Sequence, residues 1–77
     1  MTYIASINRH TGDDYESFER EYSTLTGVHR MARREFRRAG SSGRNVSDSF
    51  SEERIREGTA HSGTIGLGIR VRLSDDA

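Results

Sequence analysis

Five arginines within one short segment give this sequence its clearest capacity for chemistry. Arg30, Arg34 and Arg37 follow the i, i+4, i+7 spacing that places side chains on one face of an α-helix, and Arg33 and Arg38 flank them. Guanidinium groups bind carboxylates and phosphates through paired hydrogen bonds. We therefore predict that these five side chains form a binding surface for an acidic or phosphate-bearing partner.

The alternative for this stripe is a solvated face, partly neutralised by Glu35 and by acids elsewhere. The formal net charge is zero, which argues against a wholesale DNA mimic and equally against a generally basic nucleic-acid binder. The charge is nevertheless segregated. Residues 13–22 carry five acids and one Arg, whereas residues 30–38 carry five Arg and one Glu.

The histidines are the other candidates for chemistry. His10 lies close to Asp13 and Asp14, but this spacing matches no recognised metal-binding pattern, so we expect a capping or solvent-exposed role. His29 can serve as a ligand or pH switch, although a half-buried, hydrogen-bonded His is the favoured role. His61 lies in a Gly-rich segment. Because nothing positions a nucleophile beside a base, we predict no enzyme activity, metal or cofactor.

Residues 63–68, GTIGLG, superficially resemble a phosphate-binding loop. The glycines, however, alternate with Ile65 and Leu67 in a strand pattern, and no helix follows to present its N-terminus to a phosphate. We expect Gly66 and Gly68 to permit a bulge or the close approach of another backbone.

The arginines need a helix to align them, and the sequence predicts one over Asp13–Gly40. Its ends carry capping residues, early acids, late arginines and a closing glycine, Gly40. The weak helix formers around Gly27 favour one long helix or a kinked pair, while Thr24 or Thr26 can equally cap a second helix. The apolar stripe recurs at spacings of three and four: Tyr15, Phe18, Tyr22, Leu25, His29, Ala32, Phe36 and Ala39.

Strand patterns occupy both ends of the chain. Thr2–Asn8 alternates, and Ile4 on its second face indicates a central strand. Val46–Phe50 is a strand candidate. Ser51–Glu57 fits either a short helix or a polar edge strand, and we favour a strand. The turn-rich segment Gly58–Thr64 then connects to the clearest alternation, Ile65–Leu73, with one face packed on the helix and the other bare at its glycines and charged at its arginines.

These elements predict an α+β fold. A small antiparallel sheet of three or more strands packs on one long, possibly kinked amphipathic helix, in the order β-α-β-β. We expect the core to place Leu67, Ile69 and Val71 against Phe18, Leu25 and Phe36.

The length of 77 residues indicates a single domain, 1–77, with a thin core, because apolar residues make up only 31% of the chain. No Cys is present to form disulfides or thiolate metal sites. We therefore expect a homodimer, with Tyr15, Phe18, Tyr22 and Phe36 shared between the sheet and a partner helix. The sequence contains neither a signal peptide nor a membrane-spanning run, which predicts a cytoplasmic protein.

In size, absence of cysteine, absence of a catalytic constellation and α+β character, the chain resembles small phage-encoded inhibitors of host defence, of which the anti-CRISPR proteins are the best-known group. The resemblance concerns the general character of the chain and no motif, so it transfers no residues. It implies a non-enzymatic protein that occupies a site on a host protein or ribonucleoprotein complex in the host cytoplasm. The alternative is a small nucleic-acid-binding module that uses the arginine stripe.

Overall fold

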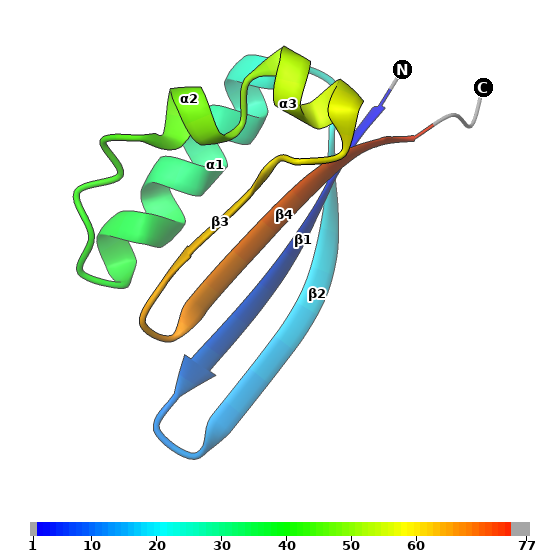
Figure 1. Cartoon of the computed structure of the whole chain (residues 1–77). Coiled ribbons are helices and arrows are strands. Elements are labelled where there is room, and N and C mark those ends of the chain that lie inside the picture. The colour runs from blue at the N-terminus through cyan, green and yellow to red at the C-terminus, as the bar shows by residue number, and fades with distance from the viewer. Residues whose placement is uncertain (1, 75–77) are drawn as a thin grey trace.

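In the described part of the chain, a four-stranded antiparallel sheet carries three helices on one of its faces (Figure 1). The computed structural model describes residues 2–74. Along the chain the elements are β1 (Thr2–Thr11), β2 (Asp14–Tyr22), α1 (Leu25–Arg38), α2 (Val46–Ser49), α3 (Glu52–Glu57), β3 (His61–Thr64) and β4 (Leu67–Ser74).

The strands lie side by side in the order β2-β1-β4-β3. Both central strands therefore come from the chain ends, and the prediction that Thr2–Asn8 forms a central strand is confirmed. The α+β class and the antiparallel sheet are also confirmed. The order β-α-β-β is wrong, because two hairpins enclose three consecutive helices. None of the helices within residues 2–74 is long and apolar enough to cross a membrane.

The N-terminal half of the predicted helix Asp13–Gly40 is strand β2, which is the main correction to the expected fold. A two-residue loop joins β1 to β2, and Gly12 supplies a positive φ of 61° there. Aromatic residues four apart, such as Phe18 and Tyr22, share a face in a strand as well as in a helix. Tyr15, three residues before Phe18, lies on the opposite face of the sheet, so the long apolar stripe does not exist.

Helix α1 begins and ends through local hydrogen bonds that the sequence encodes. The Thr24 side chain accepts a hydrogen bond from the Gly27 backbone N–H at 3.1 Å, so the alternative of a second helix capped by Thr24 is the correct one. At the other end, Gly40 takes a φ of 89°, and the Ser41 N–H donates to the Phe36 carbonyl at 2.8 Å. The predicted closing role of Gly40 is confirmed.

Two short helices replace the strands expected at Val46–Phe50 and Ser51–Glu57. Helix α2 is a single turn. At α3, the Ser51 side chain accepts from the Arg54 N–H at 3.2 Å, and Gly58 ends the helix in the left-handed conformation. The helical alternative for Ser51–Glu57 is therefore correct, because capping of this segment outweighs its weak alternation.

The C-terminal hairpin also differs from the expectation. The segment Gly58–Thr64, predicted as a connection, contains β3, and Ile65 with Gly66 forms the loop rather than the start of a strand. Gly66 has a φ of 80°, and Ile65 is 95% exposed. The alternation of apolar residues is strand-like only from Leu67 onward.

The hydrophobic core lies between the helices and the adjacent face of the sheet. The predicted contact of β4 with the helix is confirmed, since Leu67, Ile69 and Val71 are buried in one cluster with Phe36, and Phe18 and Leu25 pack against its margin. The rest of the cluster is Ala5, Ile7, Val28, Met31, Ala32, Val46, Phe50, Ile55 and Ala60. The core thus fixes which side of α1 is buried, and the outer face of the helix is turned to solvent.

Candidate functional site

All five arginines predicted to form a binding surface belong to α1. Together with Thr26 they line a shallow surface hollow of about 490 Å³. The buried side of α1 comprises Val28, Met31, Ala32, Glu35 and Phe36. With about 100° between successive helical residues, Arg30, Arg34 and Arg37 point away from that buried side. We call these three residues the arginine face.

The arginine face has no internal counter-charge. Its three side chains form no hydrogen bond or ion pair within residues 2–74, and all three residues are exposed. Three unpaired guanidinium groups along two turns of one helix present hydrogen-bond donors at regular spacing. Such a surface can grip carboxylates or phosphates spaced along a partner.

The structure ties the two flanking arginines to other groups. Arg33 Nη2 donates to the Ser47 hydroxyl at 2.6 Å, which joins α1 to α2. Arg38 Nη1 lies 3.9 Å from a carboxylate oxygen of Glu35. Of the five arginines predicted to form the binding surface, the two flanking ones also support the fold.

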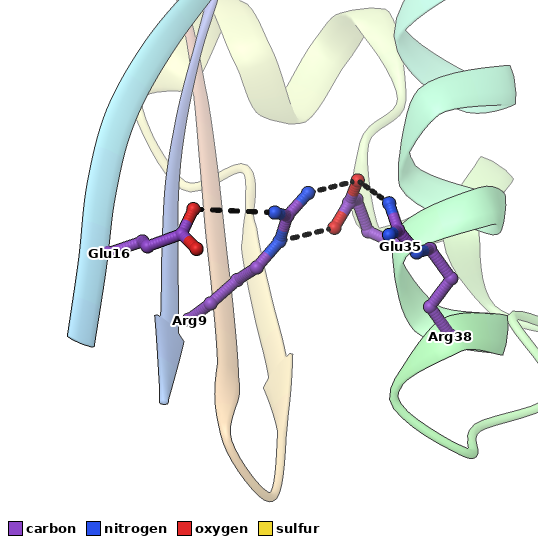
Figure 2. A network of polar contacts seen from close by, with 4 residues as sticks. All are labelled: Arg9, Glu16, Glu35 and Arg38. Atoms are coloured by element: carbon purple, nitrogen blue, oxygen red, sulfur yellow. Dashed lines mark hydrogen bonds and ion pairs between the residues drawn. The ribbon is translucent and has the colours of Figure 1, made fainter. Parts of the chain in front are cut away.

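In the alternative for the arginine stripe, Glu35 partly neutralises a solvated face, but in the structure Glu35 is buried and lies near only Arg38 of the five arginines. Its side chain is only 4% exposed, and Arg9 of β1 forms a two-bond fork with it (Figure 2). Arg9 Nε and Nη2 donate to the two carboxylate oxygens at 2.8 and 2.6 Å. Glu35 therefore cannot neutralise the arginine face.

Around this ion pair lies a second hollow of about 460 Å³, between the loop ends of both hairpins and the end of α1. Arg9, Glu16, Glu35 and Arg38 place two positive and two negative charges on its wall, and Figure 2 shows them in one chain of contacts. Because these charges already satisfy one another, the hollow is a weaker candidate for an ionic ligand than the arginine face. Arg9 was not among the residues predicted from the sequence. The available signal was Glu35, which follows Ala32 by three residues and Met31 by four and so lies on the buried side of the helix, where a carboxylate needs a partner.

The three histidines lie in separate parts of the fold. His29 is half-buried and its Nε2 donates to the Phe50 carbonyl at 2.8 Å, as favoured from the sequence. His10 packs against the Tyr15 ring, with centroids 4.6 Å apart, and Asp13 lies in the hairpin loop beyond β1. His61 opens β3. Among residues 2–74 no group of three His, Asp or Glu side chains lies close enough together to hold a metal.

The GTIGLG segment spans the loop of the C-terminal hairpin rather than lying in one strand, and no helix follows it before the described chain ends. Gly66 lies at the loop, and a Cβ there would stand 3.0 Å from the His10 carbonyl oxygen. The expected close approach of another backbone is confirmed at this residue.

Compared with known proteins, the chain matches no family model, and neither a curated protein nor a solved structure matches it significantly. The arginine face must therefore be interpreted from its own geometry.

Proposed function

We propose that this is a small non-enzymatic binding protein that acts by occupying a site on a host macromolecular complex, with the arginine face as its contact surface. The observation that carries the proposal is the set of three exposed guanidinium groups, Arg30, Arg34 and Arg37, without any acidic partner in residues 2–74. Arginine is enriched among the residues that dominate binding energy at protein interfaces.

The construction of α1 supports this role. The Thr24 cap, the buried stripe and the Arg33–Ser47 contact fix the helix before any partner arrives, so the arginine face loses little backbone freedom on binding. The chain resembles small phage-encoded inhibitors in general character. On that basis the proposed protein is of the anti-CRISPR type and acts in the host cytoplasm.

The test is a comparison of three baits in affinity purification from host cells: the natural chain, the variant Arg34→Glu with Arg37→Glu, and a control with Arg44→Glu and Arg54→Glu. Both variants change the net charge by the same amount, and all four side chains are exposed. We expect one complex to co-purify with the natural chain and the control and to be absent with the arginine-face variant. Equal recovery with all three baits would overturn the proposal.

A second candidate function is a nucleic-acid-binding module, and the same unpaired arginines favour it. Phosphate contacts release counterions, so such binding weakens steeply as salt rises. Titration against duplex and single-stranded DNA at two salt concentrations separates the candidates. A steep salt dependence that disappears in the Arg34→Glu, Arg37→Glu variant supports the nucleic-acid module, whereas binding to a purified protein complex after nuclease treatment supports the first proposal.

A further inference from the structure

Within residues 2–74, no element covers the face of the sheet opposite the helices (Figure 1). On β1 this face carries the even-numbered residues, because Ala5 and Ile7 face the core. Strand register then places Ser17, Asn8, Gly68 and Gly63 in one row across all four strands. Two neighbouring glycines leave the backbone of β3 and β4 bare beside Asn8.

The fold requires glycine at Gly63 but not at Gly68. A Cβ at Gly63 would stand 2.8 Å from the Leu67 carbonyl oxygen, so the fold itself requires glycine there. A Cβ at Gly68 would meet only Asn8 Nδ2, at 3.9 Å, and the backbone needs no positive φ. Glycine weakens a strand interior and often marks the close approach of a ligand. The fold alone gives no steric reason for Gly68.

An aromatic pair borders this bare row. Tyr15 is 58% exposed, and its ring lies 4.6 Å from that of His10 on the neighbouring strand, with the planes tilted by 53°. Large rings exposed on an open sheet are surfaces on which flat ligands stack. The misassigned helix concealed this pair, since only strand β2 brings Tyr15 onto the sheet.

A hydrogen-bond donor stands at the centre of the same surface. The hydroxyls of Tyr15 and Ser17 both donate to Asn8 Oδ1, at 3.2 and 2.8 Å. The amide oxygen of Asn8 is thus directed toward β2 and its Nδ2 group toward β4. The Nδ2 group is consequently left over Gly68, with no hydrogen-bond partner within residues 2–74.

A cation lies on the other side of the bare row. Arg70 is two residues from Gly68 on β4, faces the same way, is exposed, and forms no ion pair within residues 2–74. Arg72, further along the strand, is held by Glu19 at 3.3 Å. The order across the surface is thus an aromatic pair, an amide donor, bare backbone and a free guanidinium.

We propose that this surface, comprising Asn8, His10, Tyr15, Gly68 and Arg70, binds single-stranded nucleic acid. One unpaired base stacks on the exposed Tyr15 ring and extends toward the bare backbone at Gly68, Asn8 Nδ2 donates to a base acceptor, and Arg70 contacts the adjacent phosphate. A duplex fits poorly, because its base faces are covered by neighbouring bases. This site lies on the opposite side of the sheet from α1 and does not depend on the function proposed for the arginine face.

The test is a titration of fluorescently labelled single-stranded DNA and RNA oligonucleotides with the whole protein, followed by anisotropy. Two variants remove the surface: Gly68→Val fills the bare row, and Tyr15→Ala removes the exposed ring. Loss of one stacked base predicts an affinity about 5- to 150-fold lower for Tyr15→Ala. Thr64→Val is the matched control, since it adds an apolar side chain to an exposed strand position outside the surface and is expected to bind as the natural chain does.

Gly68→Val also separates binding from folding. Because Val favours strands and the position is open, its melting temperature is expected to equal or exceed that of the natural chain while binding falls. If Gly68→Val does not fold, Tyr15→Ala decides. In NMR spectra, the Asn8 side-chain amide and the Gly68 backbone amide are expected to shift as oligonucleotide is added.

Three results would overturn the proposal. The first is the absence of binding by the natural chain at low salt, and the second is unchanged affinity in folded Gly68→Val and Tyr15→Ala. The third is loss of binding in the Arg34→Glu, Arg37→Glu variant alone, which would place the nucleic acid on the arginine face. The same titration with duplex DNA tests the strand preference, and tighter binding to the duplex counts against the proposal.

Discussion

Arg9 on β1 and Glu35 on α1 form a two-bond ion pair that joins the sheet to its longest helix, with Glu35 only 4% exposed. Removing one partner of a buried ion pair leaves the other charge without compensation. Arg9→Met is therefore expected to lower the free energy of unfolding by about 3 kcal/mol. For a domain of this size that corresponds to a melting temperature lower by about 12 °C or more, measurable by circular dichroism.

The double variant Arg9→Met with Glu35→Leu is expected to recover most of this loss, because an apolar pair of similar volume replaces the charges. Arg56→Ala is the control: its ion pair with Glu52 is also 2.8 Å long, but both side chains are more than half exposed, so the expected loss is about 0.5 kcal/mol or less. A double variant no more stable than Arg9→Met would contradict this account of the pair.

Two isoleucines in the C-terminal hairpin provide a test of the core. Ile69 is 2% exposed, whereas Ile65, at the hairpin loop, is 95% exposed. Ile69→Ala is expected to destabilise the protein by about 2–5 kcal/mol, enough to unfold much of a marginal domain. Ile65→Ala removes the same atoms and is expected to leave the unfolding midpoint in urea within error. Equal effects of the two substitutions would show that this hairpin is not placed as described.

The arginine face is expected to contribute to binding and hardly to stability. Arg34→Glu with Arg37→Glu removes no internal contact, so the free energy of unfolding is expected to change by about 0.5 kcal/mol or less. Affinity for the partner isolated with the natural chain is expected to fall by about 30-fold or more, as for arginines at the centre of an interface. Isothermal titration calorimetry measures the affinity. A comparable loss in the Arg44→Glu, Arg54→Glu control would indicate a general charge effect.

The expected homodimer remains a prediction, and the structure changes its basis. Tyr15 and Phe18 lie on opposite faces of the sheet, so no shared aromatic helix stripe exists. Strand β2 is instead an open sheet edge. Antiparallel pairing of two β2 strands about Phe18 would place Glu16 of each copy opposite Arg20 of the other, with no like charges directly opposed.

Light scattering at high micromolar concentration is expected to give a dimer mass for the natural chain. Arg20→Glu creates like-charge pairs and is expected to give a monomer, while Glu16→Arg combined with Arg20→Glu restores the pairing and the dimer. A monomer mass for the natural chain would remove the prediction. An unchanged dimer in Arg20→Glu would move the interface away from β2.

The sequence by itself determined the elements whose signals are local. Thr24, Gly27 and Gly40 mark the ends of α1 through hydrogen bonds within a few residues, and Leu67, Ile69 and Val71 alternate where one face of a strand is buried. Ser51 and Gly58 delimit α3 through equally local signals, although the alternation of this segment led us to favour a strand. Helix geometry alone places Arg30, Arg34 and Arg37 on one face, as their spacing in the sequence predicted.

Only the tertiary structure decided what residues 14–22 become and which charges remain free. Residues four apart lie on the same face of a helix and of a strand, so the spacing of Phe18 and Tyr22 is compatible with either element. Pairing with β1 over nine residues makes this segment a strand. The overlooked local signal was Gly12 followed by Asp13, a common hairpin loop. Glu35 and Arg9 are 26 residues apart, and their pairing depends on how α1 packs on the sheet. The free charge of the arginine face and the open surface around Tyr15 both follow from that long-range packing, which short-range spacing does not encode.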